Sequence, residues 1–344
     1  MSATSSLARV DDVLRSRNSV HHAVVLLESA DGSRRHTATT HRMGLDDRFI
    51  TASISKLFVH AIAYALVDRG ILALDQLAEP WVGADTMRGI HTIKGRDYGA
   101  WITLRHLVTH TSGLPNLETA SVNGAPSIEK QILQRDREVP LSDVLDLHRR
   151  VPGKFPPGSG HRAHYSDTNA DLLALLLERA TDTPYDQLLK GFILEPLGLH
   201  RTGLVHTDTS DPAPVFRRRR PVTFTRYLSS QHGSGGVVAS ASDLMVFLRA
   251  FMEGALFSRE HLTNPDWRRT QYGPLQYGPG VMRLAVPRLL SPLFPAPAIV
   301  GHSGSTGSFA FYCPSYETYI VGTVNQMSGV PFEYVYRYLN AFAR

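Results

Sequence analysis

The sequence has little cysteine, little lysine and no long apolar run, and each shortage narrows what the protein can be. Its single cysteine, Cys313, excludes an internal disulfide and a metal site built from several thiolates. No apolar run approaches the ~20 residues that a membrane-spanning helix needs. The segment from Met1 to Asn18 lacks the basic cluster and apolar stretch of a secretory signal. We therefore expect a soluble, cytoplasmic protein without a membrane partner.

Charge of either sign is also sparse. The 344 residues carry a net charge of +5 and 19% charged residues, and this basic bias is too weak to indicate nucleic acid as a partner. Arginine supplies most of the positive charge, so a lysine such as Lys56 is a rare residue here. The 42% of hydrophobic residues excludes a wholly disordered chain and is enough to fill one large domain or two lobes. No feature indicates an oligomeric state.

Short apolar runs near both ends of the chain predict strands. Ala23–Leu27 and His36–Met43 flank the turn pair Asp31-Gly32, an arrangement typical of a β-hairpin. Three further runs near the carboxyl end predict more strands: Ala298–Gly301, Ser308–Cys313 and Thr318–Val324.

Helical periodicity dominates the middle of the chain and recurs at its ends. The predicted helices include Leu7–Leu14, Ser55–Arg69 ended by Gly70, one capped by Thr103, Asn169–Ala180, one beginning at Ser240, and Phe332–Phe342. We therefore predict an α+β fold with two lobes. Residues 1–70 and 241–344 would form an α/β lobe with a sheet from both termini, and residues 71–240 a mainly helical lobe, with the active site between them.

The sharpest local motif is Ser53-Ile54-Ser55-Lys56. It would place Ser53 and Lys56 one helical turn apart on the same face. A serine hydroxyl needs an adjacent base to become a good nucleophile, and a lysine in a dry site can lose its proton and act as that base. The alternative is a solvated helix face, because Ser-x-x-Lys is common by chance.

Two further motifs contain groups that suit acyl chemistry. Tyr165-Ser166-Asp167 precedes a predicted helix, and a tyrosine near a cation can act as a general base. Its alternative is a buried tyrosine followed by a helix cap at Asp167 or Thr168. The run Gly301–Gly307 contains His302, a candidate electrostatic partner or proton donor. Its alternative is a tight turn between two strands.

These three motifs occur in the order found in the serine β-lactamase and penicillin-binding protein superfamily, which the sequence resembles. That family is marked by Ser-x-x-Lys, Tyr-x-Asn and Lys/His-x-Gly. Four more stretches are similar to the family patterns LLxHTSGLP, FxPG…YS, PLGMxxT and GGLxSTxxDLxxF, namely Leu107–Pro115, Phe155–Gly158 before Tyr165, Glu195–Leu199 with Thr202, and Gly235–Leu244. The histidine variant of the third motif resembles the esterase, class C β-lactamase and D-aminopeptidase branch.

The resemblance implies a β-lactamase/DD-peptidase-like fold, with an antiparallel sheet flanked by helices, and acyl transfer through a covalent serine ester. Ser53 would attack a carbonyl, with Lys56 and Tyr165 handling its proton. The backbone N–H groups of Ser53 and Ser305 would form the oxyanion hole. The residues expected to bind substrate are Asp167, His302, Ser303 and Gly304. No metal or organic cofactor is implied.

Asp167 departs from the family pattern, which has asparagine at this position. An asparagine can donate a hydrogen bond to a substrate carbonyl, whereas an ionised aspartate cannot. A carboxylate near Lys56 favours the charged ammonium. We hypothesise that the Asp167 carboxylate makes Tyr165, in place of Lys56, the main general base, and that it weakens the binding of β-lactam-like amides. The alternative is that Asp167 only caps the following helix.

Other candidate sites have weaker support. His106 and His110 have i, i+4 spacing but lack the glutamate of HExxH, and Gly233–Gly236 lacks the P-loop lysine. No Gly-x-Ser-x-Gly elbow is present, which argues against an α/β-hydrolase. The basic run Arg217–Arg220 is either a solvated loop or an attractor of acidic substrates at the cleft mouth.

The sequence therefore predicts a serine hydrolase, an esterase or amidase acting on a small acyl substrate. One alternative is a biosynthetic acyltransferase or transesterase, because nothing in the sequence distinguishes water from another acceptor. The other is a binding protein that keeps the fold without turnover.

Overall fold

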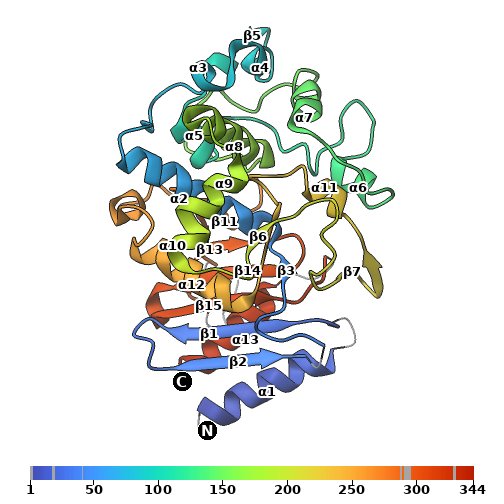
Figure 1. Ribbon diagram of the computed structural model, residues 1–344, viewed down its shortest axis with the longest axis vertical. Coiled ribbons are helices and arrows are strands. Elements are labelled where there is room, and N and C mark those ends of the chain that lie inside the picture. Colours follow the sequence, from blue (N-terminus) through green and yellow to red (C-terminus); the bar gives the residue numbers. More distant parts are fainter. Residues whose placement is uncertain (1–2, 18–19, 41, 287–288, 290–295, 328–330) are drawn as a thin grey trace.

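The computed structural model describes residues 3–17, 20–40, 42–286, 289, 296–327 and 331–344 (Figure 1). The helices are α1 (Ala3–Ser16), α2 (Ser55–Asp68), α3 (Glu79–Val82), α4 (Ala84–Met87), α5 (Leu104–Val108), α6 (Ile128–Ile132), α7 (Leu141–His148), α8 (Asp167–Thr181), α9 (Tyr185–Leu189), α10 (Glu195–Leu197), α11 (Thr225–Leu228), α12 (Ala241–Glu253) and α13 (Phe332–Phe342). Short 3-10 turns are η1 (Ala52–Ile54), η2 (Gly99–Trp101), η4 (Arg259–Leu262) and η6 (Pro314–Tyr316), and η3 (Lys190–Leu194) is a π-helical turn.

The strands are β1 (Val24–Ser29), β2 (Arg35–Thr39), β3 (Phe49–Ile50), β4 (Thr92–Ile93), β5 (Arg96–Asp97), β6 (Gly203–Leu204), β7 (Val215–Arg217), β8 (Arg220–Val222), β9 (Val237–Ala239), β10 (Arg268–Arg269), β11 (Leu275–Tyr277), β12 (Met282–Leu284), β13 (Ile299–Ser303), β14 (Ser308–Cys313) and β15 (Thr318–Thr323).

Strands from both ends of the chain form one antiparallel sheet, as predicted. Its order over the described residues is β10-β11-β12-β13-β14-β15-β1-β2. The first hairpin joins the last strand, because Leu26 of β1 lies opposite Val321 of β15 and Thr37 of β2. The strands predicted at Ser308–Cys313 and Thr318–Val324 are confirmed as β14 and β15.

The large sheet is buried on both faces, and the side chains of β1 alternate between two cores. Val24 and Leu26 belong to the core that contains α12, whereas Val25 and Leu27 belong to the core that contains α1 and α13. Successive strand residues point to opposite faces, so a strand covered on both faces has an unbroken apolar sequence. This explains the run of aliphatic residues in the first predicted strand.

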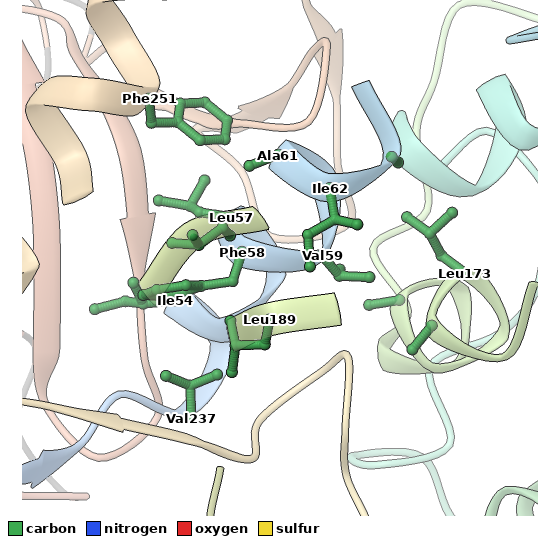
Figure 2. Close-up of a cluster of buried hydrophobic side chains, with 14 of the residues drawn as sticks. Ile54, Leu57, Phe58, Val59, Ala61, Ile62, Leu173, Leu189, Val237 and Phe251 are labelled. Carbon is green, nitrogen blue, oxygen red and sulfur yellow. The ribbon is translucent and has the colours of Figure 1, made fainter. Parts of the chain in front are cut away.

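Helix α2 lies in the middle of the molecule, between the large sheet and the helices of the central segment (Figure 1). Figure 2 shows Leu57, Phe58 and Ile62 of this helix among the side chains of Phe251 from α12 and Leu173 from α8. Every residue of the helix from Ser55 to Leu66 is buried, Lys56 and His60 included. Because the Ser53 segment leads directly into α2, this packing holds the start of the helix firmly.

Three predicted helix boundaries are confirmed by their capping interactions. The Thr103 hydroxyl accepts a hydrogen bond from the His106 N–H at the start of α5. Ser240 accepts one from the Asp243 N–H at the start of α12. Gly70 follows α2 with a φ of 69°, the left-handed conformation that glycine adopts at little cost.

The division into lobes at residues 70/71 and 240/241 stays a prediction. The strands of the large sheet all come from residues 24–39 and 268–323, which fits it. A small sheet nevertheless crosses the boundary, because β3 pairs with β9, and β9 pairs with β6. Over the described residues, the helices fall short of the length and apolar character that a bilayer crossing requires.

The packing of α12 against α2 gives a test of the core. The rings of Phe58 and Phe247 stack with their centroids 3.7 Å apart, and Phe247 is fully buried. We expect Phe247→Ala to lower the free energy of unfolding by about 3–5 kcal/mol, because it removes buried contacts and leaves a cavity. Val246, on the same helix and 45% exposed, is the matched control. Val246→Ala should cost less than about 0.5 kcal/mol in urea denaturation, and equal effects of the two variants would contradict this packing.

Candidate active site

Ser53 lies in a strained turn that is clamped to a neighbouring strand. Ala52, directly before it, has a φ of 47°, which is rare for a residue with a side chain. The Thr51 N–H and hydroxyl both donate to the Val237 carbonyl of β9, at 3.1 and 2.7 Å. Ser55 is fully buried and accepts the Val237 N–H at 3.0 Å. The two serines of the motif therefore differ: Ser55 binds the fold together, and Ser53 keeps an exposed surface at a cavity.

The ammonium of Lys56 has no exposed surface, and it donates to three acceptors. Its Nζ lies 3.1 Å from Ser53 Oγ, 2.5 Å from Asp167 Oδ1 and 2.8 Å from the Ser234 carbonyl oxygen. A buried cation is costly unless it is paired and fully hydrogen-bonded. These three acceptors use all three N–H groups of the ammonium, and one of them is the hydroxyl of Ser53.

Asp167 reaches Lys56 from the first residue of α8. The N-cap of this helix is Ser166, and no side-chain hydrogen bond caps it there. The alternative that Asp167 only caps the helix is therefore wrong, because its carboxylate forms the ion pair with Lys56. Asp167 also lines the cavity beside Ser53, which is compatible with the predicted contact to substrate.

The third acceptor of Lys56 comes from the glycine-rich loop, and sequence reasoning missed it. The Asp171 carboxylate accepts the N–H groups of Gly233 and Ser234, at 3.1 and 3.0 Å, and so orients the Ser234 carbonyl. A Cβ on Gly233 would lie 2.1 Å from the Ala170 carbonyl oxygen. The close approach of this loop to α8 therefore requires glycine at position 233. The sequence carries no motif that indicates this contact.

Tyr165 lies beside Lys56 and is almost fully buried. The Lys56 Nζ is 5.1 Å from the centre of the Tyr165 ring. Burial raises the pKa of Tyr165 well above its usual value, and the charge of Asp167 raises it further, while a hydrogen bond with Ser53 lowers it. The phenol of the free protein is therefore protonated at neutral pH.

The side chain of His110 packs against Tyr165 and fixes its position. Its ring stacks on the Tyr165 ring with centroids 4.7 Å apart. The His110 Nδ1 lies 3.1 Å from the Ser166 backbone N and 3.0 Å from Asn169 Nδ2, so it accepts both hydrogen bonds as a neutral imidazole. Burial lowers the pKa of His110 well below its usual value. His106 is used differently, because its Nδ1 accepts the Thr103 N–H and completes the capping box of α5.

The turn after β13 brings Ser305 to Ser53. The Ser308 hydroxyl donates to the Thr51 carbonyl at 2.7 Å, and the Thr306 hydroxyl donates to the Ile50 carbonyl at 2.9 Å. A Cβ on Gly304 would lie 2.4 Å from the Thr51 carbonyl oxygen, so the close approach requires glycine. Ser53 and Ser305 consequently line the same cavity.

His302 lies in the interior behind these residues. Its Nδ1 is 2.8 Å from the Ser303 carbonyl oxygen, which assigns the proton to Nδ1. Burial and the nearby Lys56 charge lower the pKa of His302 well below its usual value. Its ring centre is 5.9 Å from that of Tyr165. The imidazole is therefore neutral, and contact with substrate stays a prediction for it.

Two adjoining cavities share the lining residues Tyr165, Tyr272 and Ser305. One, of about 180 Å³, is lined by Ser53, Asp167 and several residues that sequence reasoning missed, among them Asn116, Glu118 and Tyr227. The other, of about 190 Å³, is lined by Ser303, Gly304, Tyr272 and Tyr277. Asn116 and Glu118 directly follow the Leu107–Pro115 motif. Their closeness to this motif is the feature of the sequence that could have indicated their place at the cavity. A larger cavity of about 500 Å³, near Arg105 and Arg268, includes none of the predicted site residues.

The basic run Arg217–Arg220 forms the exposed turn of the β7–β8 hairpin. The hairpin is attached beside the Ser53 cavity, because the Met327 N–H donates to the Phe216 carbonyl and Met327 lines that cavity. A role in attracting acidic substrates stays untested.

Comparison with known proteins identifies relatives. The family model described as Beta-lactamase matches residues 13–343. The putative penicillin-binding protein PbpX of Bacillus subtilis is 30% identical over 47% of this chain and 38% of its own length. Esterase EstB of Burkholderia gladioli is 30% identical over 64% of this chain and 57% of its own length. The chain thus spans about two fifths of the first of these proteins and three fifths of the second.

Solved structures share the fold over nearly the whole chain. A D-stereospecific amidohydrolase from a Streptomyces species superimposes with a TM-score of 0.76 at 23% identity, covering 95% of this chain and 96% of that one. At this level of identity the likeness shows the fold. The predicted β-lactamase-like α+β architecture is confirmed.

The Lys56–Asp167 pair gives a stability prediction. We expect Asp167→Asn to lower the free energy of unfolding by about 3 kcal/mol, because it leaves a fully buried ammonium without its counter-charge. In a Lys56→Met background the same substitution should cost much less, since no ammonium remains there. Urea denaturation of the four proteins in this double-mutant cycle measures the coupling. Additive effects would contradict the proposed dependence of the two residues on each other.

Proposed function

The chain belongs to the β-lactamase family, and on that premise we propose that it is a serine hydrolase. It would cleave small ester or amide substrates through a covalent acyl intermediate on Ser53. The observation that carries the proposal is the contact between Lys56 Nζ and Ser53 Oγ at 3.1 Å, at the wall of a cavity that Tyr165 and Ser305 also line. A nucleophile, a proton-transferring group and a candidate oxyanion donor converge there.

The reaction would proceed in two steps. Lys56 or Tyr165 would first release its own proton to solvent, because the free protein holds an ammonium and a phenol. The Ser53 oxygen then bonds to the substrate carbonyl carbon while its proton passes to the amine or phenolate so formed. The carbonyl oxygen becomes an oxyanion that accepts the backbone N–H groups of Ser53 and Ser305. Collapse breaks the bond to the alcohol or amine, which takes up a proton and leaves. Water then attacks the ester on Ser53, releases the acid and returns the proton to the serine.

The names of relatives support an ester or amide substrate without selecting between them. They include an esterase, a D-alanyl-D-alanine-carboxypeptidase/endopeptidase, D-amino acid amidases and a hydrolase with promiscuous acyltransferase activity. Transfer of the acyl group to an alcohol or amine in place of water therefore stays an alternative outcome of the same intermediate.

The nucleophile is tested by turnover and intact mass. Wild type should hydrolyse p-nitrophenyl esters and gain one adduct from a fluorophosphonate, because Ser53 Oγ attacks both. Ser53→Ala should lose at least about 10³-fold in kcat and stay unlabelled. Ser142→Ala, which changes an exposed serine on α7, is the control and should match wild type. An inert, unlabelled wild type would instead favour a binding protein, and labelling without turnover would favour the same conclusion.

The effect of Asp167 is tested by the pH profile of Asp167→Asn. The Asp167 charge raises the pKa of Tyr165, so its removal lowers that pKa and lets the phenolate form at lower pH. The acidic limb of the kcat/KM profile on esters should therefore move to lower pH. The added amide N–H should also increase β-lactam turnover by up to about tenfold, which corresponds to one hydrogen bond to a substrate carbonyl. If the pH profile on esters and the β-lactam turnover of Asp167→Asn both match wild type, the Asp167 carboxylate affects neither the general base nor the binding of β-lactams.

A further inference from the structure

Four buried polar side chains form a cluster beside Tyr165 that the proposed reaction does not use. They are His60 of α2, His110 after α5, Tyr277 of β11 and His302 of β13, and we call them the histidine cluster. Tyr277 is 1% exposed, and the three histidines have no exposed surface. The centre of the Tyr277 ring lies 4.3 Å from the ring centre of His110, 5.9 Å from that of His302 and 6.4 Å from that of His60. Residues from four separate segments thus meet at one ring in the interior.

Each member of the cluster has one buried polar atom without a hydrogen-bond partner among the described residues. These atoms are the Tyr277 hydroxyl and Nε2 of His60, His110 and His302. Such an atom costs free energy, and folded proteins supply nearly all of them with a partner, which is often an ordered water. Four of them around one ring indicate that they share a partner.

The second ring nitrogen of each histidine determines whether Nε2 is a donor or an acceptor. His60 Nδ1 lies 2.8 Å from the Gly280 carbonyl oxygen, so it carries the proton and Nε2 is an acceptor. His302 Nδ1 lies 2.8 Å from the Ser303 carbonyl oxygen, with the same result. His110 Nδ1 accepts two N–H groups, which leaves the proton on Nε2 as a donor. Burial lowers the pKa of all three histidines, so each carries one ring proton at neutral pH.

One water molecule complements this set of polar atoms. It donates two hydrogen bonds and accepts two, and the cluster offers two acceptors, His60 and His302, and two donors, His110 and the Tyr277 hydroxyl. Internal waters typically make about three hydrogen bonds to buried polar groups, so the cluster can satisfy one fully. A metal ion does not fit, because the His110 N–H would face it, and the described His, Cys, Asp and Glu residues form no group of three that could hold one.

We propose that the histidine cluster binds a buried water molecule, and that this water makes His60 a positioning residue for Tyr165. The second part rests on the proposed function, because it treats Tyr165 as a proton-transferring group. The Tyr165 ring centre lies 4.7 Å from that of His110, 5.9 Å from that of His302 and 6.0 Å from that of Tyr277. A water bonded to these three residues and to His60 Nε2 limits how far their rings turn, and so fixes the rings that contact Tyr165.

A high-resolution crystal structure of wild type tests the water directly. We expect a density peak within about 3.2 Å of at least three of the four unpartnered atoms, which is the range of ordinary hydrogen bonds. A cluster without a peak, or rings turned so that these atoms bond directly to one another, would overturn the proposal. A peak about 2.0 Å from two or more ring nitrogens would also overturn it, because that is the distance of a bound metal ion.

The Tyr277 hydroxyl provides a test in solution. Tyr277→Phe keeps the ring and removes only the group that bonds to the water, so it should raise the equilibrium constant of unfolding about fivefold, the effect of one hydrogen bond. Tyr185 of α9 is the matched control, because its fully buried hydroxyl also lacks a partner among the described residues but lies outside the cluster. Tyr185→Phe should leave the constant within about twofold of wild type. Urea denaturation measures both, and no increase in Tyr277→Phe, or an equal increase in both variants, would overturn the water site.

Variants of His60 test its positioning role. His60 lines none of the three cavities described above, so we expect it to act without touching substrate. His60→Leu removes the Nε2 acceptor, and it should lower kcat on p-nitrophenyl esters at least about fivefold while KM stays within about twofold of wild type. His60→Gln places an amide oxygen near the position of Nε2, and it should restore kcat to within about twofold of wild type. The kcat values are calculated per site labelled by a fluorophosphonate, so that unfolded protein does not count.

The outcomes separate the inference from the proposed function. Unchanged kcat in His60→Leu, or an equal loss in His60→Leu and His60→Gln, would overturn the positioning role and leave the water site and the hydrolase function in place. If wild type is inert and unlabelled, the proposed function fails and the positioning role fails with it. A density peak and a destabilised Tyr277→Phe variant would still support the water site in that case.

Discussion

The burial of a single ammonium is the constraint on which the rest of the site depends. Lys56 is fully enclosed, and its cost in free energy is offset only because three acceptors meet it from three separate segments. Ser53 precedes it in the chain, Asp167 begins α8, and Ser234 lies in the loop before β9. Any shift of one segment leaves an N–H of the ammonium unpaired. The position of Ser53 is therefore coupled to the packing of elements more than 100 residues apart in the chain.

Each of those segments is in turn held by packing and hydrogen bonds of residues that take no part in the proposed reaction. Helix α2 is buried from Ser55 to Leu66 and fills the space between the sheet and α8 (Figure 2). Asp171 fixes the Ser234 loop, and His110 fixes both Tyr165 and the start of α8. Such rigid support is what a nucleophile and its proton-transferring partners need, because reaction requires alignment within a fraction of an ångström.

Sequence reasoning predicted the sheet and the main helices because their signals are local. Alternating apolar residues, Gly70 after α2 and the caps at Thr103 and Ser240 are all readable from a few neighbouring residues. The site was predicted only where a motif carried it. Ser234 contacts Lys56 through its backbone carbonyl, which any residue possesses, and Glu118 lines a cavity that forms only after folding. The position of Asp167 in an ion pair, not at a cap, depends equally on where α2 comes to lie.

We propose that the nucleophile is Ser53, which lines the cavity, and not its buried neighbour Ser55. Ser53 and Ser55 lie two residues apart in one peptide, so only the position of a covalent label separates them. The most direct measurement is fragmentation mass spectrometry of that peptide after brief reaction of wild type with a fluorophosphonate. We expect the whole adduct to lie on Ser53. An adduct on Ser55, or on a serine outside this segment, would contradict it.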